Sequence, residues 1–122
     1  MKKFLAMSAI LLSVIILQMP QVAADNEYYV GKYATGYDVY LLLDSYNFKS
    51  FLNLDFTCKV KATNGYDVQY ISYHFWIENG SPHYLNSDGY GGTITDDPAF
   101  RVEANIFKFT AITATEFLKS QR

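Results

Sequence analysis

The sequence predicts an α+β domain, in which an antiparallel β-sheet of four to six strands carries a C-terminal helix on its apolar face. Residues 54–63 alternate strictly between apolar and polar side chains, the period-two pattern of a half-buried strand. Asn64-Gly65 follows, a preferred pair for a two-residue type I′ turn, and predicts a central hairpin over 54–77. Beyond residue 97, apolar side chains recur with the 3.6-residue period of a helix.

The first 24 residues predict an export signal. A positively charged start precedes the apolar stretch Phe4–Leu17, and Ala24 ends a small-residue cleavage site. The apolar stretch has about 14 residues, fewer than the roughly 20 that span a bilayer as a helix. We therefore expect a cleaved signal peptide over 1–24 and no stable membrane insertion after cleavage. Residues 25–122 are expected to form a single small globular domain, secreted or located in the periplasm or cell envelope.

The charge balance excludes some classes of partner. The sequence has 10 Lys and Arg and 12 Asp and Glu, and two lysines fall in the predicted signal, which leaves 8 − 12 = −4 for residues 25–122. Nucleic acid and anionic membranes both require a basic surface, so we expect no nucleic-acid partner. The 11 tyrosines are typical of β-rich cores and also suit exposed recognition surfaces.

Four further strands are expected, two before the hairpin and two after it. They are 28–33, 37–43, 83–85 and 93–95. Residues 44–53 are ambiguous between a helical turn and an irregular loop. Residues 86–92 are rich in Asn, Ser, Asp and Gly, and predict a turn-rich loop that could border a ligand.

The C-terminal segment is predicted to be a helix that begins near Asp97. Asp97 suits the N-cap, and Pro98 suits the first helical position because it lacks the N–H that would be left without a partner there. The apolar stripe comprises Val102, Ile106, Phe107, Phe109, Ala111, Ala114, Phe117 and Leu118. Threonines and β-branched residues lower helix propensity, so a strand over 104–113 is the alternative.

A two-residue turn would also set the register of the hairpin. On the apolar face it pairs Cys58 with Ile71, Phe56 with Tyr73 and Leu54 with Phe75. On the polar face it pairs Lys59 with Tyr70, Thr57 with Ser72, Asp55 with His74 and Asn53 with Trp76. The only cysteine is therefore expected to be a buried apolar side chain.

The polar face of the hairpin is the predicted binding surface. Aromatic rings interleaved with hydrogen-bonding groups suit a sugar ring or an extended peptide. The predicted ligand-binding residues are Tyr70, His74, Trp76, Lys59 and Asn53, with Tyr90 from the neighbouring loop. Two alternatives are that a second layer covers this face, such as 44–53 or the N-terminal strands, or that the aromatic residues only support the strand pairs.

Asp55 and His74 are the only weak candidates for catalysis. A carboxylate beside an imidazole forms the orienting half of a nucleophile–His–Asp arrangement. Ser72 lies two residues along the same strand, roughly 6.5 Å from His74 and too far for a direct hydrogen bond. An ordinary cross-strand charge pair is the preferred interpretation. The spacing of His, Cys and acidic residues matches neither a zinc site nor a calcium loop, so we expect no metal and no cofactor.

The segments YYVGKYATGYDVYLLLDS, FTCKVKA, ISYHFW and NSDGYGG resemble a loose group of short exported bacterial proteins that have no assigned activity. The resemblance covers most of residues 28–109 and consists mainly of strand and turn residues. It implies secretion and a single compact domain, and it carries over no catalytic residue.

The sequence therefore predicts an exported, non-enzymatic binding or interaction domain. Its expected ligand is a glycan or an extended peptide, bound on the aromatic strand face. A small hydrolase or lyase that uses Asp55 and His74 is the first alternative. A protein inhibitor or an envelope assembly subunit, which would bind another protein at the cell envelope, is the second.

Overall fold

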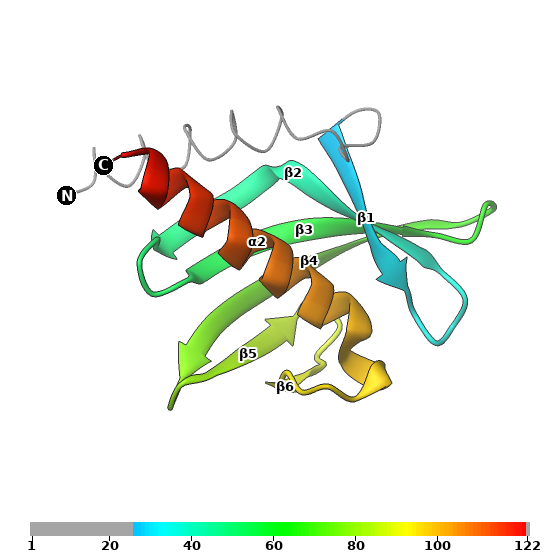
Figure 1. The fold of residues 1–122 in the computed structure, drawn as a ribbon. Coiled ribbons are helices and arrows are strands. Elements are labelled where there is room, and N and C mark those ends of the chain that lie inside the picture. The colour runs from blue at the N-terminus through cyan, green and yellow to red at the C-terminus, as the bar shows by residue number, and fades with distance from the viewer. Residues whose placement is uncertain (1–25, 122) are drawn as a thin grey trace.

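The computed structural model describes residues 26–121 and shows a curled antiparallel sheet with one long helix across it (Figure 1). The strands follow each other in chain order: β1 Glu27–Lys32, β2 Asp38–Ser50, β3 Asp55–Thr63, β4 Val68–Glu78, β5 Ser81–Asn86 and β6 Gly91–Thr93. A short 3₁₀ helix, η2 Pro98–Phe100, leads into the helix α2 Arg101–Ser120. The predicted α+β class is confirmed. The predicted signal segment lies outside the described residues.

The β3–β4 hairpin forms, but its predicted register is wrong by two residues. Pairing begins at Thr63 and Val68, whereas the two-residue turn would have placed Tyr66 opposite Thr63. The Asn64 side-chain oxygen accepts hydrogen bonds from two backbone N–H groups of the turn, at 2.9 and 2.7 Å, which stabilises a four-residue connection. Gly65 has a φ of 94°, but Asn64 does not have the positive φ that a type I′ turn requires.

A slip of two residues keeps every side chain on its predicted face, because side chains alternate with a period of two. Phe56 therefore lies opposite Phe75, and Cys58 opposite Tyr73, instead of the predicted partners. All four side chains are buried, as the apolar pattern indicated. Leu54 does not face Phe75: it lies in the turn before β3 with a φ of 52°.

The ambiguous segment 44–53 continues β2 as far as Ser50 and then turns. The pairing of β2 with β3 shifts between Leu42 and Asn47, which marks a bulge. At this bulge the Ser45 hydroxyl accepts a hydrogen bond from the Lys59 N–H at 2.8 Å and donates to the Leu42 carbonyl at 2.6 Å. A side chain thus replaces ladder hydrogen bonds, an arrangement that hydrophobic periodicity cannot reveal.

The C-terminal segment is a helix, so the alternative of a strand over 104–113 is wrong. Its start agrees with the prediction, because the Asp97 carboxylate accepts a hydrogen bond from the Ala99 N–H at 2.9 Å. A 3₁₀ turn precedes the α-helix proper, which begins at Arg101. No helix among residues 26–121 is long and apolar enough to cross a membrane.

The helix buries a mixed stripe against the concave face of the sheet. Most of the predicted apolar residues are buried, but Leu118 is 39% exposed. Three polar residues that the prediction omitted are buried beside them: Glu103, Thr110 and Thr113. The Thr110 and Thr113 hydroxyls each donate to the carbonyl four residues earlier in the helix, at 2.8 Å, which satisfies both groups without water.

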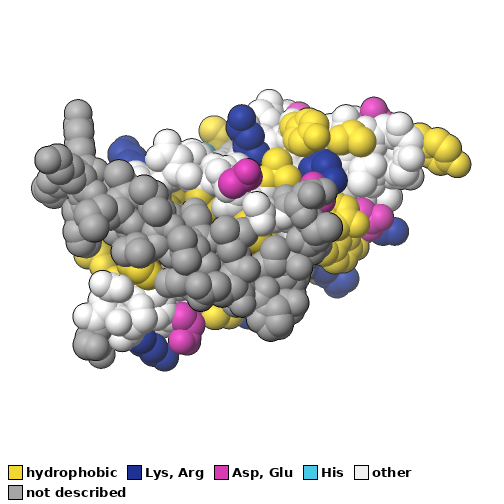
Figure 2. All heavy atoms as spheres, turned by 90° about the horizontal axis from the view of Figure 1, so that it is seen from above, with side chains coloured by type: hydrophobic (Ala, Val, Ile, Leu, Met, Phe, Trp, Pro, Cys, Tyr) yellow, Lys and Arg dark blue, Asp and Glu magenta, His cyan; other side chains and the backbone are white. Residues whose placement is uncertain are grey.

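The outer surface carries charges of both signs. Figure 2 shows Lys, Arg, Asp and Glu side chains interspersed with hydrophobic ones on the face seen from above. The most exposed large hydrophobic side chain among the described residues is that of Tyr66, 99% exposed in the β3–β4 turn. Where the described residues are visible on this face, Lys and Arg lie among Asp and Glu and do not form a continuous basic surface.

Cys58 is expected to resist a thiol reagent in the folded protein and to react after denaturation. Its side chain is 1% exposed, and burial raises the pKa of the thiol, so the reactive thiolate is suppressed. Labelling with iodoacetamide, followed by intact-mass analysis with and without guanidinium, measures both states. Prompt labelling of the native protein would contradict the burial of Cys58.

Candidate functional site

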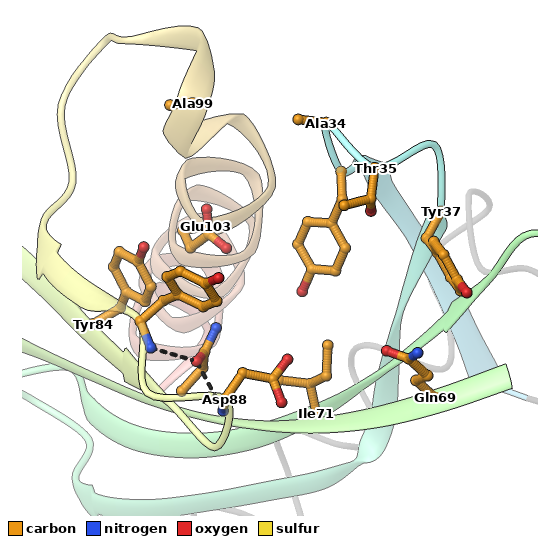
Figure 3. Close-up of a pocket in the computed structure, with 12 residues that line it drawn as sticks. Ala34, Thr35, Tyr37, Gln69, Ile71, Tyr84, Asp88, Ala99 and Glu103 are labelled. Carbon is orange, nitrogen blue, oxygen red and sulfur yellow. Dashed lines mark hydrogen bonds between the residues drawn. The ribbon is translucent and has the colours of Figure 1, made fainter.

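A cavity of about 420 Å³ opens near the N-terminal end of α2 (Figure 3). Three segments distant in the sequence surround it: the β1–β2 turn, the start of β4, and β5 with the loop that follows it. Four tyrosines contribute to its lining, namely Tyr33, Tyr37, Tyr84 and Tyr90. The amides of Gln69 and Asn86 and the carboxylates of Asp88 and Glu103 add polar groups to the lining. The cavity thus combines aromatic rings with convergent polar groups.

Local hydrogen bonds hold the two loops at the rim. In the β1–β2 turn, the Gly36 N–H donates to the Tyr33 carbonyl at 2.9 Å, and Gly36 has a φ of 92° that favours glycine. In the β5–β6 loop, the Asn86 side-chain oxygen accepts hydrogen bonds from the Asp88 and Tyr90 N–H groups, each at 3.0 Å. Figure 3 shows both bonds as dashed lines. The rim residues are therefore held by turn chemistry encoded in the sequence.

Two residues of the cavity lining, Glu103 and Tyr33, are joined through Tyr73 by a chain of short hydrogen bonds. The Tyr73 hydroxyl donates to Oε2 of Glu103 at 2.6 Å. The hydroxyl oxygens of Tyr73 and Tyr33 are also 2.6 Å apart. Since Tyr73 donates its only hydroxyl proton to Glu103, Tyr33 is the donor in the second bond. The chain joins the first turn of α2 to β4 and to the end of β1.

Burial shifts the pKa values of all three groups. It raises the pKa of the Glu103 carboxyl, and the hydrogen bond from Tyr73 opposes this shift. It raises the pKa of Tyr33 to about 12, and the negative charges of Glu103 and Asp88 contribute to that rise. The pKa of Tyr73 is also raised, chiefly by burial and then by the charge of Glu103. Perturbed titratable groups in a cavity are typical of functional sites.

The raised pKa of Glu103 predicts a specific pH dependence. The Glu103 carboxyl binds its proton more tightly in the folded protein than in the unfolded chain. The free energy of unfolding therefore falls as pH rises from 4.5, the ordinary pKa of a glutamate, through the higher pKa that Glu103 has in the folded protein. Below pH 4.5 the carboxyl is protonated in both states, and this loss of stability is absent. Denaturant titrations of wild type and Glu103→Gln across this range measure it, and the difference between them is expected to change with pH. Parallel curves would contradict the shift.

The predicted binding surface lies on the other face of the sheet, away from α2. Tyr70 is 65% exposed there, and His74 and Trp76 are partly exposed. The ring of Trp76 lies between two imidazoles, with centroid distances of 4.7 Å to His74 and 5.8 Å to His83. The segments considered as covering layers, 44–53 and the N-terminal strands, belong instead to this same sheet.

Asp55 and His74 are in contact, although their backbones are not paired. Oδ1 of Asp55 lies 2.7 Å from Nε2 of His74. The backbone partner of His74 is Thr57, so the contact runs diagonally across the hairpin. The predicted pairing of Thr57 with Ser72 is wrong for the same reason.

The other predicted residues are dispersed. Lys59 pairs with Ser72, so its predicted position opposite Tyr70 is wrong; Lys61 occupies that position instead. Asn53 does not lie opposite Trp76. It sits in the turn after β2, where its N–H donates to the Ser50 hydroxyl at 3.3 Å. Tyr90 lines the cavity, on the other side of the sheet from the predicted strand face.

The sequence pattern does not identify the inner members of the site. It places Tyr33 and Tyr73 in strands and assigns no role to Glu103. One signal was available for Glu103, because it falls in helical phase with the buried positions Ile106 and Thr110. An acidic residue on the buried face of a helix usually has a polar partner, which here is Tyr73.

Searches against protein-family models, curated proteins and solved structures give no match. Within residues 26–121, no group of three or more His, Cys, Asp or Glu side chains is placed to hold a metal ion.

Proposed function

We propose that this chain is an exported, non-enzymatic binding domain that holds a small organic ligand, or the end of a larger one, in the cavity beside α2. The observation that carries the proposal is the cavity itself, whose volume of about 420 Å³ lies within the range of ligand sites. Tyrosine rings offer flat apolar surfaces, and amide, hydroxyl and carboxylate groups provide orientation. A sugar unit or the end of a peptide has the dimensions for such a site.

The aromatic strand face is the competing location for the ligand. Its rings lie on the outward side of the strands, where Tyr70 is exposed and Trp76 is partly covered by the two imidazoles. A surface of this kind suits an extended chain, whereas the cavity can enclose a ligand from several sides. Enclosure favours the cavity, because it removes more of the ligand surface from water.

Substitution of two exposed tyrosines can distinguish binding in the cavity from binding on the strand face. Tyr90 lines the cavity and is 69% exposed, and Tyr70 lies on the strand face and is 65% exposed. Truncation of either side chain is expected to change the free energy of unfolding by only about 0.5 kcal/mol, because exposed substitutions have small effects. Any change in ligand binding would then report the location of the site and not a loss of folding.

The test is a titration of the isotope-labelled protein with oligosaccharides, short peptides and small amines, followed by NMR. We expect a ligand to shift the amide signals of residues 33–37 and 86–90. Tyr90→Ala should weaken this binding, and Tyr70→Ala should leave it unchanged. If Tyr70→Ala or Trp76→Ala weakens binding and Tyr90→Ala does not, the cavity proposal is wrong and the site is the strand face.

A small hydrolase or lyase is the second candidate, favoured by the 2.7 Å contact between Asp55 and His74. The carboxylate orients the imidazole, as a general base requires. Activity against envelope glycans and peptides that is lost in His74→Ala and kept in His83→Ala would support this candidate. Both histidines flank Trp76, so His83→Ala is a matched control. Activity that survives His74→Ala would contradict it.

A further inference from the structure

We infer that the ligand of the cavity is an organic cation that carries an ammonium or guanidinium group. The inference rests on the proposed function and narrows it to one chemical class. It is carried by the two carboxylates of the cavity lining, by the burial of Glu103 without an ion-pair partner among the described residues, and by the surrounding tyrosine rings.

The charge of the lining has one sign. Glu103 projects into the cavity from the first turn of α2, and Asp88 faces it from the β5–β6 loop (Figure 3). Among the described residues that line the cavity, none is Lys, Arg or His. Lys32 and Arg101 line a separate hollow, which shares Ala34 and Ala99 with the cavity. An anionic ligand would therefore meet repulsion from both carboxylates.

The Glu103 carboxylate has no ion-pair partner among residues 26–121, although the residue is only 5% exposed. Its hydrogen bonds come from uncharged groups, the Tyr73 hydroxyl and a backbone N–H. A buried carboxylate without a paired charge lowers stability, so such groups usually coordinate a cation or neutralise. The Tyr73 hydrogen bond and the position in the first turn of α2 both favour the ionised form. An ammonium or guanidinium group of a bound ligand would supply the counter-charge to Glu103.

The tyrosine rings suit the same ligand. The electron-rich face of an aromatic ring attracts a cation within about 6 Å of the ring centroid. Tyr33, Tyr84 and Tyr90 approach the cavity from three different elements, and their hydroxyl oxygens also accept hydrogen bonds. The carboxylates would attract the charge of an organic cation, and the tyrosine rings would contact its apolar part. A neutral sugar would leave both carboxylates without a counter-charge.

Three small probes of one shape test the class directly: 2-phenylethylammonium, 2-phenylethanol and phenylacetate. Each carries the same ring, and they differ in a cationic, neutral or anionic end. With the purified protein from cells that express the full chain, we expect the ammonium to bind in calorimetry and NMR. The alcohol is expected to bind about tenfold to a hundredfold more weakly, the value of a hydrogen bond to a charged group, and phenylacetate weaker still.

Glu103→Gln is the diagnostic variant, because glutamine keeps an acceptor for Tyr73 and removes the charge. It is expected to lose the preference for the ammonium over the alcohol. Glu116→Gln is the matched control, since Glu116 lies on the same helix with its side chain 63% exposed and outside the cavity. Asp88→Asn, in the exposed loop, is a second variant that does not alter the buried chain of hydrogen bonds. It should weaken ammonium binding in part.

The outcomes separate this inference from the proposed function. Equal binding of alcohol and ammonium, weakened by Tyr90→Ala, would overturn the cation class and leave the cavity as the binding site. Ammonium binding that is lost in Tyr70→Ala and kept in Tyr90→Ala would overturn both. Failure of the ammonium probe to bind at millimolar concentration, or unchanged preference in both Glu103→Gln and Asp88→Asn, would also overturn the cation class.

Discussion

Phe56→Ala is expected to lower the free energy of unfolding by about 3–5 kcal/mol, the range for a large aromatic side chain lost from a packed core. Phe56 is 0% exposed and lies at the centre of the contact between β3 and its neighbours. Its ring centroid lies 5.1–6.4 Å from those of Phe75, Phe48, Tyr46 and Phe107. These rings come from β2, β4 and α2, so no single neighbour can move to fill the space.

Chemical denaturation followed by circular dichroism measures this loss. The matched control is Leu52→Ala, because Leu52 lies in the turn before β3 and is 74% exposed. The control is expected to change stability by about 0.5 kcal/mol or less. A loss in Phe56→Ala below about 1 kcal/mol would mean that the core can collapse around the missing ring, contrary to its packing in this fold.

The sequence predicted the faces of the strands but not their register. Period-two alternation assigns each side chain to one side of the sheet, and this assignment depends only on neighbours along the chain. The register depends on the turn, and Asn64-Gly65 suits both a two-residue type I′ turn and the four-residue turn that the Asn64 side chain stabilises. The four-residue turn is distinguished by the hydrogen bonds that the Asn64 side chain accepts, and the sequence alone does not show whether these bonds form.

The predicted contact between Asp55 and His74 is present in the structure, but the two residues are not paired as predicted. The predicted register placed them directly opposite each other, and the structure places Thr57 opposite His74. Diagonal neighbours on one face of an antiparallel pair remain within reach of long side chains. Asp55 and His74 therefore remain in contact when the register shifts by two residues. The predicted contact of Asn53 with Trp76 is lost, because β3 begins only at Asp55 and Asn53 lies outside it.

The cavity could be predicted only in fragments. The loop 86–92 was expected to border a ligand, and its members Asp88 and Tyr90 line the cavity. Other parts of the wall come from residues near 33, from β4 and β5, and from Glu103, which are brought together by the curl of the sheet and the direction of α2. Neither property follows from local periodicity.

Tyr73→Phe is expected to lower the free energy of unfolding by about 1–3 kcal/mol at neutral pH, because it removes a partner from a buried charged group. The substitution keeps the ring, which stacks on Phe75 at 5.4 Å, and removes only the hydroxyl. Oε2 of Glu103 then loses its donor, and the Tyr33 hydroxyl loses its acceptor. Denaturant unfolding of the purified protein measures the change.

Two further Tyr→Phe substitutions serve as controls for Tyr73→Phe. Tyr33→Phe removes only the outer hydrogen bond of the chain and is expected to have a smaller effect. Tyr70→Phe, on the exposed strand face, is expected to change stability by about 0.5 kcal/mol or less. Equal effects of all three substitutions would contradict a special role for the bond between Tyr73 and Glu103.

A double-mutant cycle identifies the charge on Glu103 as the source of the effect. Hydrogen bonds to an ionised acceptor are roughly twice as strong as neutral ones. In the Glu103→Gln background, Tyr73→Phe should therefore lower stability by less than it does in wild type. The two residues share a 2.6 Å hydrogen bond, so their effects should not add. Additive losses would mean that the charge on Glu103 does not strengthen its hydrogen bond with Tyr73. The buried carboxylate would then be neutral in the folded protein at this pH, which would also remove the basis for its attraction of a cation.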